Sequence, residues 1–248
     1  MRRGIYVLCT AALVSATPAS ADHKVYSPIV EEGVLELEAR GHRSVDPASD
    51  KDNQQTHVYE LAYGVNSWWY TSLFGKLNKE PQGNFSYDAT AWENIFQLTP
   101  QGKYWLDLGF YAEYERSAHG RGTPDEIEFK LLLEKDVYPL VLTANLIFNR
   151  EIGRNSGKGA GFEYAVRAKY PWKRSIQFGV EAFGEPGRLT GFEPIALQEH
   201  AIGPVMLGKF NVEGVPGVFN YNLGYLFGLT RASAKGTVKW QFEYEIPF

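Results

Sequence analysis

Few residues in this chain have the types and spacing that catalysis needs. A serine hydrolase needs a serine with a histidine in reach, and no Gly-x-Ser-x-Gly segment occurs. Among the five histidines, His42 and His57 flank a long loop and could meet across a hairpin, although histidines without a function are the simpler interpretation. The sequence therefore predicts no catalytic residue and a protein that is not an enzyme.

Two loops share part of a ligand-binding motif and lack the rest. Gly153 and Gly157, with Lys158 after them, resemble a phosphate-binding loop. However, three residues instead of four separate these glycines, and Gly159 replaces the required serine or threonine. The loop of residues 46–53 is acidic and could hold Ca²⁺, yet no glycine or bidentate glutamate stands at EF-hand spacing. We predict no metal site and no cofactor.

Ionisable residues do recur at every second position of several segments. In the last one, Thr237–Phe248, Lys239, Glu243 and Glu245 alternate with an apolar and largely aromatic set. A spacing of two indicates a β-strand, because successive side chains point to opposite faces. The strand of a soluble protein rarely has so aromatic a face. We therefore expect the apolar face to contact lipid and the polar face to line a lumen.

Twelve such segments can be counted, which predicts an all-β protein, an antiparallel up-and-down transmembrane β-barrel of 12 strands. Both termini of a single-chain bacterial barrel lie on the periplasmic side, so the strand number must be even. One weak segment contains Pro204, which cannot donate to a ladder. The predicted strands span residues 34–43, 57–65, 69–77, 89–98, 105–115, 127–133, 140–149, 162–170, 175–184, 200–207, 219–229 and 237–248.

The first 21 residues have the three parts of a secretory signal. Two arginines precede the apolar stretch Ile5–Val14, and the small-residue site Ala19–Ala21 follows it. We expect residues 1–21 to be a signal peptide that is removed, and residues 22–248 to form a single barrel domain. The only cysteine, Cys9, lies in this leader, so the mature chain has no disulfide.

The expected connections alternate between short turns and longer loops, as periplasmic turns and extracellular loops do in this class. Trp68, Trp69, Trp105 and Trp172 lie close to the short turns, as expected of an aromatic belt at a membrane interface. The short turns span residues 66–67, 99–102, 135–137 and 171–173, the longer loops span 44–55, 78–85, 116–125, 151–161 and 185–199, and residues 208–217 are long where a short turn is expected.

The polar face of the strands predicts an ionic barrel interior. Acidic residues outnumber basic ones there, which favours cations or neutral solutes over anions if the lumen is open. The alternative is that opposite charges on neighbouring strands pair and brace the wall. Gly109 and Gly179 on inward positions either leave room in the lumen or relieve strain where the sheet curves. The pore-lining candidates are Glu36, Glu38, Arg40, Glu60, Asp107, Glu113, Glu115, Glu128, Lys130, Glu163, Arg167, Lys169, Glu181, Lys239, Glu243 and Glu245.

The chain resembles bacterial outer-membrane β-barrels in its leader, its alternating strands and its terminal Phe248. That residue type implies an assembly signal, with the outer-membrane barrel assembly machinery as a partner. The segment Tyr59–Tyr70 is similar to the strand, tight turn and strand of the transporter family associated with the MetA pathway of phenol degradation. This resemblance implies uptake of small organic solutes and brings no catalytic residues with it.

Together these patterns predict a porin-like channel for the passive passage of small solutes across the bacterial outer membrane, reached after export to the periplasm. The alternative is a plugged barrel that acts as a surface adhesin or a structural protein. The expected partners are the lipid bilayer and a small solute. With 29 acidic against 25 basic residues, the chain lacks the positive charge that nucleic-acid phosphates require.

Overall fold

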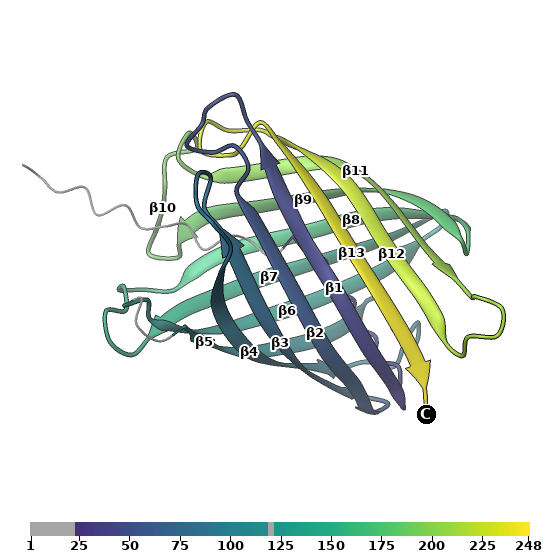
Figure 1. Ribbon diagram of the computed structural model, residues 1–248. Coiled ribbons are helices and arrows are strands. Elements are labelled where there is room, and N and C mark those ends of the chain that lie inside the picture. The colour runs from purple at the N-terminus through teal and green to yellow at the C-terminus, as the bar shows by residue number, and fades with distance from the viewer. Residues whose placement is uncertain (1–22, 119–121) are drawn as a thin grey trace, which may run out of the picture.

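The computed structural model describes residues 23–118 and 122–248, and within these ranges all regular structure is β. No helix there is long and apolar enough to cross a bilayer. Figure 1 shows the strands side by side around a common axis. They are β1 (Val34–Val45), β2 (Gln55–Asn66), β3 (Trp69–Lys79), β4 (Ser86–Gln97), β5 (Asp107–Ser117), β6 (Asp125–Val137), β7 (Leu140–Ile152), β8 (Gly161–Lys173), β9 (Ile176–Arg188), β10 (Gly191–Phe192), β11 (Glu199–Phe210), β12 (Val218–Gly228) and β13 (Gly236–Pro247).

Twelve of these strands form a closed antiparallel barrel. The first and last strands, β1 and β13, pair over their whole length, from Val34 opposite Pro247 to Val45 opposite Gly236. Every other long strand pairs with its neighbours in the chain, and the two-residue strand β10 adds only to β9. Closure satisfies the backbone groups of both end strands, as a bilayer requires. The predicted 12-stranded up-and-down barrel is confirmed.

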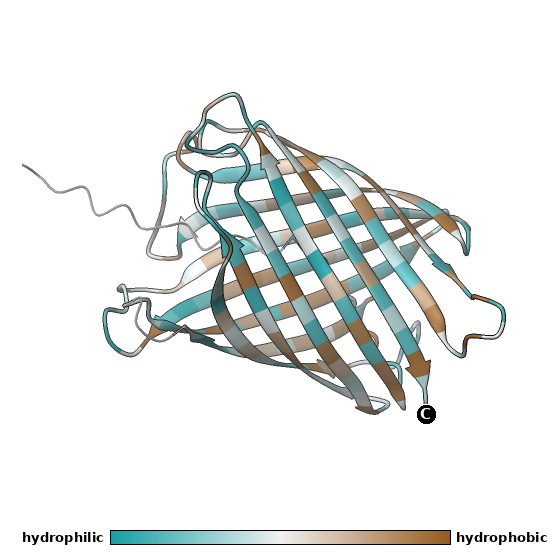
Figure 2. Cartoon of the chain, viewed as in Figure 1, coloured by the Kyte–Doolittle hydropathy of each residue, from teal (hydrophilic) through white to brown (hydrophobic). Residues whose placement is uncertain are grey.

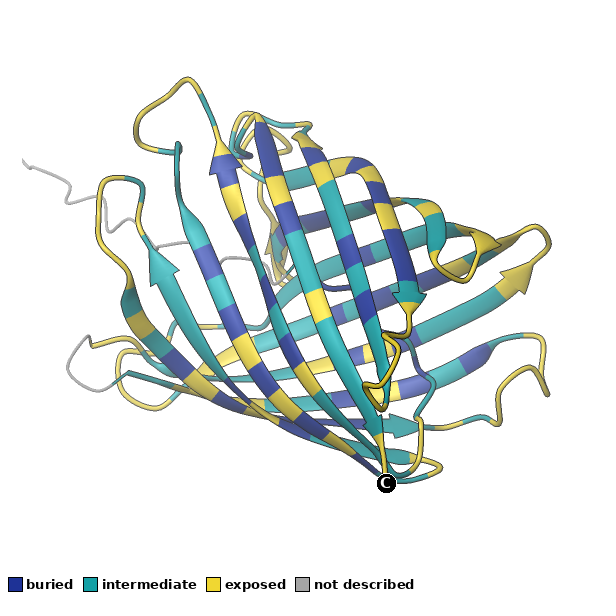
Figure 3. Cartoon of the chain, turned by 45° about the vertical axis from the view of Figure 1, so that its right-hand side comes forward, coloured by how far each residue is buried: buried dark blue, intermediate teal, exposed yellow. Residues whose placement is uncertain are grey.

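The alternation in the sequence becomes an apolar outside and a polar inside. On β2, Tyr59 and Leu61 are more than half exposed on the outer surface, whereas Glu60 between them is 4% exposed. Figure 2 shows the two residue types alternating along the strands, and Figure 3 shows burial alternating in the same way. An outer surface of Tyr, Leu, Trp and Phe side chains needs hydrocarbon around it, while the ionic interior does not. The chain is therefore a transmembrane barrel of the bacterial outer membrane.

Both ends of the strand set meet at one rim, which we call the short-turn rim because three of its five turns are very tight. They join β2 to β3, β6 to β7 and β8 to β9. The other two, residues 98–106 and 211–217, are longer. The prediction of a short turn at 99–102 is therefore wrong. Thr99 Oγ1 accepts a bond from Leu108 N and Asp107 Oδ1 accepts one from Gly102 N, so a folded loop forms before β5 begins.

This loop also moves Trp105 out of the strand in which it was predicted and leaves it 77% exposed at the rim. Trp68 and Trp172 are also exposed near this end. In outer-membrane barrels the short turns face the periplasm, so the long loops lie on the outer side of the membrane.

Strand β11 tolerates Pro204 because the ladder to β12 is interrupted there. Pairing passes from Ile202 opposite Phe227 to Val205 opposite Gly224, so Gly203 and Pro204 have no partner on that side. On the β9 side Pro204 stays in register opposite Val180. Gly203 is required because an added Cβ would lie 1.9 Å from the Tyr225 carbonyl oxygen.

Candidate functional site in the lumen

The structure places all sixteen pore-lining candidates on the inner face of the barrel, where all but Glu36 and Lys169 form hydrogen bonds or ion pairs instead of lining a wide opening. Glu38, Arg40 and Glu60 are each at most 4% exposed. Lys130, Glu181 and Lys239 are equally buried on other strands. Residues 23–33, which the sequence patterns did not assign to the lumen, fill the space between the walls of the barrel.

Residues 23–33, which we call the plug segment, run through the barrel interior before β1 begins. Lys24 contacts Glu38 on β1 and Glu60 on β2. Tyr26 reaches strands β4 to β7, and its ring lies 5.0 Å from that of Tyr111 on β5. Val25 packs with buried residues of β7, β8, β9 and β12. Three consecutive side chains thus touch nine of the twelve strands, which is possible only near the barrel axis.

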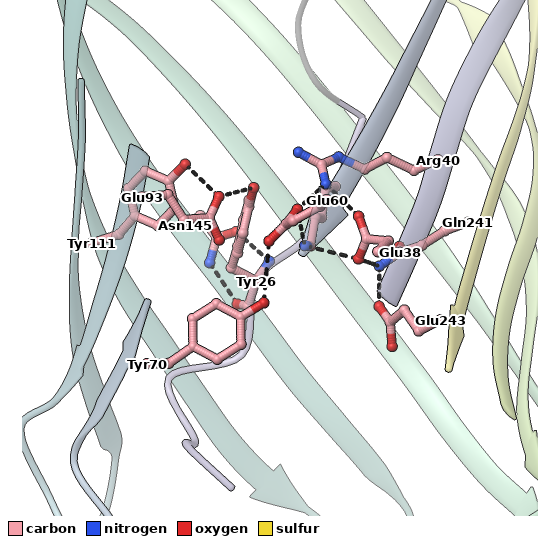
Figure 4. A network of polar contacts seen from close by, with 11 residues as sticks. Tyr26, Glu38, Arg40, Glu60, Tyr70, Glu93, Tyr111, Asn145, Gln241 and Glu243 are labelled. Carbon is pink, nitrogen blue, oxygen red and sulfur yellow. Dashed lines mark hydrogen bonds and ion pairs between the residues drawn. The ribbon is translucent and has the colours of Figure 1, made fainter. Parts of the chain in front are cut away.

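Asn145 on β7 holds the backbone of the plug segment. Its Oδ1 accepts a bond from Tyr26 N at 2.8 Å, and its Nδ2 donates to Tyr26 O at 2.9 Å. The side-chain amide therefore reproduces the two-bond pairing of a neighbouring strand. The Tyr26 hydroxyl donates to Glu93 Oε2 at 3.1 Å, and Tyr111 donates to the same oxygen at 3.0 Å. Figure 4 shows these groups converging on Tyr26.

A second group of contacts surrounds Lys24. Its Nζ lies 2.9 Å from Glu38 Oε2 and 3.5 Å from Glu60 Oε2. Arg40 bridges the same two carboxylates, so two cations and two anions neutralise one another inside the barrel (Figure 4). The Tyr70 hydroxyl donates to Glu60 Oε1 at 3.1 Å. Buried charges that are paired and hydrogen-bonded in this way are costly to separate.

Glu181 on β9 forms a further buried group on the opposite side of the plug segment. Lys239 Nζ lies 2.5 Å from Glu181 Oε2, and Asn222 Nδ2 donates to Oε1 at 2.9 Å. Arg167 Nη1 is 3.7 Å from the same Oε1. Here the alternative interpretation of the ionic interior applies, because opposite charges on different strands brace the wall.

Cavities lie on both sides of the plug segment, and one of about 470 Å³ at the short-turn rim shares Glu36, Arg167 and Lys169 with the inner cavity described next. The outer vestibule, about 310 Å³, lies under the long loops and is lined by His23, His42, Phe183 and His200 among others. The inner cavity, about 280 Å³, lies beside the plug segment and is lined by residues of β1, β8, β9, β11, β12 and β13, with Tyr70 of β3 and Ile95 of β4. Val25 lines the inner cavity, Phe183 lines the outer vestibule, and the two pack in one buried cluster with Leu226. This cluster and the plug segment separate the outer vestibule from the inner cavity.

The plug segment explains one of the inward glycines. A Cβ on Gly109 would lie 2.8 Å from Pro28 Cβ, so glycine is needed where the plug segment approaches β5. Gly179 has a different role, because an added Cβ there would meet Ala168 O on the neighbouring strand at 2.9 Å. Gly109 thus leaves room in the lumen for the plug segment, and Gly179 allows β8 and β9 to approach closely.

The two histidines of the first hairpin do not meet. His42 points inward and its ring lies 4.5 Å from that of His23. His57 points outward, with its ring 5.3 Å from that of Trp240. His42 stands opposite Thr56 in the β1–β2 register, so His57 is one position out of phase and lies on the other face. The expectation that they could come together is wrong.

The site residues missed by sequence reasoning are those of the plug segment itself. They show no strand alternation and lie between the expected leader and the first strand. The available signal was a run of apolar residues, Val25, Tyr26 and Ile29 among them, in a stretch assigned to neither.

Comparisons with known proteins leave the family open. No family model matches the chain, and no curated protein does. The similarity of residues 59–70 to the transporter family of the MetA pathway therefore gains no support.

Solved structures match at low similarity. The translocator domain of the autotransporter NalP from Neisseria meningitidis matches with 12% identity and a TM-score of 0.42, covering 87% of each chain. OccD1 (OprD) matches with 10% identity and a TM-score of 0.40, covering 88% of this chain and 66% of that one. LpxR from Salmonella typhimurium matches with 10% identity and a TM-score of 0.41, covering 86% and 100%. Because identity and TM-score are this low, no function is transferred from these structures, and the proposal that follows depends on the geometry of this chain.

Proposed function

We propose that this protein is a non-enzymatic outer-membrane channel for the passive passage of small solutes, closed in the present conformation by the plug segment. The observation that carries the proposal is that the plug segment separates the outer vestibule from the inner cavity. The barrier between them includes Val25 and Tyr26, which belong to no strand of the wall. A barrier of this kind can move without breaking the barrel.

The free energy that holds the plug segment is moderate. Burial of Val25 stabilises the closed state by about 1.5 kcal/mol or more, and the two bonds to Asn145 add about 1–3 kcal/mol. Displacing Lys24 also separates buried ion pairs, a cost that water or a solute cation entering the lumen must offset. With that cost offset, the open state is a minor state that a ligand can favour by binding it better.

The charges of the lumen support a preference for cations or neutral solutes. Of the sixteen inward candidates, eleven are acidic and five are basic. An acidic lumen raises the local concentration of cations and repels anions.

The second candidate function is a permanently plugged barrel that acts as a surface adhesin or structural protein. Its supporting observation is the extent of buried ionic pairing, because Glu38, Glu181 and Lys239 each form an ion pair and are at most 4% exposed. A barrel braced in this way needs no solute, and its long loops then provide the working surface.

A reversible lock distinguishes the two functions. In the double variant Pro28→Cys/Gly109→Cys, the two Cβ atoms start about 2.8 Å apart and must separate by about 1 Å to form a disulfide. The chain, expressed without its leader, has no other cysteine. In planar bilayers we expect stepwise cation-preferring conductance after reduction and none after oxidation. Pro28→Cys alone is the control and should conduct in both states.

Three outcomes would contradict the channel proposal or a part of it. Absence of steps in both redox states supports the plugged barrel. Steps that persist after oxidation show that solutes bypass the plug segment. Steps that favour anions remove the role of the acidic lumen. Resistance to SDS before heating verifies that each variant forms a folded barrel.

The remaining assignments belong to the same proposal. Residues 1–21 are removed as a signal peptide, and residues 22–248 form the barrel domain. Phe248, 81% exposed at the short-turn rim, is the signal to the barrel assembly machinery.

A further inference from the structure

The inner cavity has two charged sides that are poorly compensated by the protein. On one side are Glu36 of β1 and Glu243 of β13, whose carboxylate oxygens lie within 4.8 Å of each other in a group with Glu38. On the other side are Arg167 and Lys169, two positions apart on β8. All four line the same cavity of about 280 Å³.

The acidic side lacks a cation of its own. Among the residues that the structure describes, Glu36 makes no hydrogen bond or ion pair, and the hydrogen-bond partners of Glu243 are the neutral amide of Gln241 and the carboxyl group of Glu38. The nearest cation, Lys24, is bound to Glu38 and Glu60. Two ionised carboxylates at this separation repel each other unless one takes up a proton or a positive group lies between them.

The basic side is equally incomplete. In the described part of the chain, Lys169 forms no ion pair and no hydrogen bond, and Arg167 Nε has no partner. Arg167 contacts Glu181 only at 3.7 Å, through a different nitrogen. A carboxylate between these two side chains would satisfy donors that now lack an acceptor.

Between the two sides lie buried amides that also lack partners. Asn220 on β12 is 8% exposed, and neither its Oδ1 nor its Nδ2 has a hydrogen-bond partner. Asn222, 5% exposed, leaves its Oδ1 unpaired. Both line the inner cavity, and Asn220 stands opposite Glu243 in the β12–β13 register. Buried polar atoms without partners are rare, so a cavity that gathers three of them is built for a polar occupant.

We propose that the inner cavity is a binding site for a small zwitterion, a solute with one ammonium and one carboxylate group. The ammonium group lies between Glu36 and Glu243, the carboxylate meets Arg167 and Lys169, and Asn220 and Asn222 bind the polar body between them. A zwitterion compensates both sides at once and is neutral overall, so this inference rests on the proposed channel for neutral solutes and names their class.

Equilibrium binding to the whole refolded chain in detergent tests the site. The probes are 4-aminobutanoate, butanoate and butylammonium, compared by saturation-transfer NMR. We expect the zwitterion to bind at least about tenfold more tightly than either analogue that lacks one charge, because each charge-assisted contact contributes that much or more. Glycine and 6-aminohexanoate then measure the spacing between the two charged sides.

Variants locate the binding. Lys169→Gln and the double variant Glu36→Gln/Glu243→Gln should each weaken 4-aminobutanoate binding about tenfold or more. Glu163→Gln, also inward on β8 but outside the inner cavity, is the matched control and should bind as the wild type does. Resistance to SDS before heating checks that every variant is folded.

Three results would overturn the proposal. The first is a zwitterion that binds no more tightly than its singly charged analogues. The second is unchanged affinity in both the lysine and the glutamate variants. The third is Ca²⁺ binding that depends on Glu36 and Glu243 without any binding of the zwitterion, which assigns the carboxylates to a metal. Because binding needs no permeation, a site that binds in a barrel that does not conduct refutes only the channel.

Discussion

Asn145 is the residue on which the closed state depends most directly, because one side chain makes both backbone bonds to Tyr26. In Asn145→Ala both bonds are lost, which weakens the plug by about 1–3 kcal/mol. The population of the displaced segment should rise about 5- to 150-fold. Hydrogen exchange of residues 23–32, measured by mass spectrometry, should accelerate accordingly.

The control for this prediction is Asn149→Ala on the same strand. Asn149 donates to Glu163 and makes no contact with the plug segment. Wild-type exchange rates in Asn145→Ala would show that other contacts hold the segment and that Asn145 contributes less than about 1 kcal/mol.

Glu181 is the residue whose pairing most affects stability. In Lys239→Met the carboxylate keeps Asn222 and a distant Arg167 but loses its closest cation. Removing one partner of a buried ion pair costs about 3–5 kcal/mol. The midpoint of urea unfolding in detergent should fall, and Lys239→Met/Glu181→Gln should recover part of the loss because no uncompensated charge remains. A double variant less stable than Lys239→Met would contradict this account.

For individual residues, the sequence predicted only whether a side chain points into the barrel or out of it. The alternation around Glu60, Glu181 and Lys239 indicated that these side chains point inward, and they do. It did not indicate that Lys239 pairs with Glu181, since their strands lie on either side of β11 and β12. Such pairings depend on the barrel's curvature, which local periodicity does not contain.

At the scale of elements, two loops of the long-loop end are joined. Lys51 Nζ donates to Arg231 O at 2.6 Å and to Ala232 O at 2.7 Å. Asp46 accepts bonds from Ala48 N and Lys235 N, each at 2.8 Å. The first and last long loops thus form one cover beside the β1–β13 seam.

The Asp46 contact makes this cover sensitive to acid. The backbone N–H groups of Ala48 and Lys235 lower the pKa of the Asp46 carboxyl below its usual value. A lowered pKa in the folded state means that the contact stabilises the fold above the ordinary aspartate range, near pH 4. That stabilisation is lost as the pH falls through the folded pKa.

We therefore expect the NMR shift of the Lys235 amide proton to titrate with a midpoint below that of a free aspartate. In Asp46→Asn the same amide should show no such titration. A wild-type midpoint at or above the ordinary value would contradict the assigned hydrogen bonds.

The strands themselves were the most predictable elements. All twelve predicted segments are strands, and most extend one to several residues further than expected. Periodicity identifies strands because lipid on one face and ions on the other impose a period of two. The ends were less predictable, since bonds such as Asp107 Oδ1 to Gly102 N decide where a turn stops.

At the scale of the whole molecule, the even strand number and the alternating pattern predicted a closed barrel with both termini on the periplasmic side. The first and last strands do meet at one rim, but the expectation is wrong for the upstream end of the described residues, because His23 lies under the long loops. Whether the lumen is empty could not be predicted in that way. The plug segment lacks a hydrophobic period because wall strands surround it. Its residues contact nine strands, so no regular alternation of apolar and polar side chains is required. Its position follows from contacts such as Tyr26 with Asn145, which lie 119 residues apart in the chain.

The path of the plug segment has one more consequence. Its downstream end is fixed at the short-turn rim, where Phe248 N donates to Gly33 O at 2.7 Å. Its upstream end, at His23, lies beneath the long loops. Pairing of β1 with β13 thus closes the barrel around the plug segment, which is continuous with β1. A folded domain fused ahead of His23 is too wide to pass through the barrel, so we expect such a fusion to leave the plug segment outside the lumen. Fusions that preserve the closed state therefore belong in a surface loop such as residues 153–160.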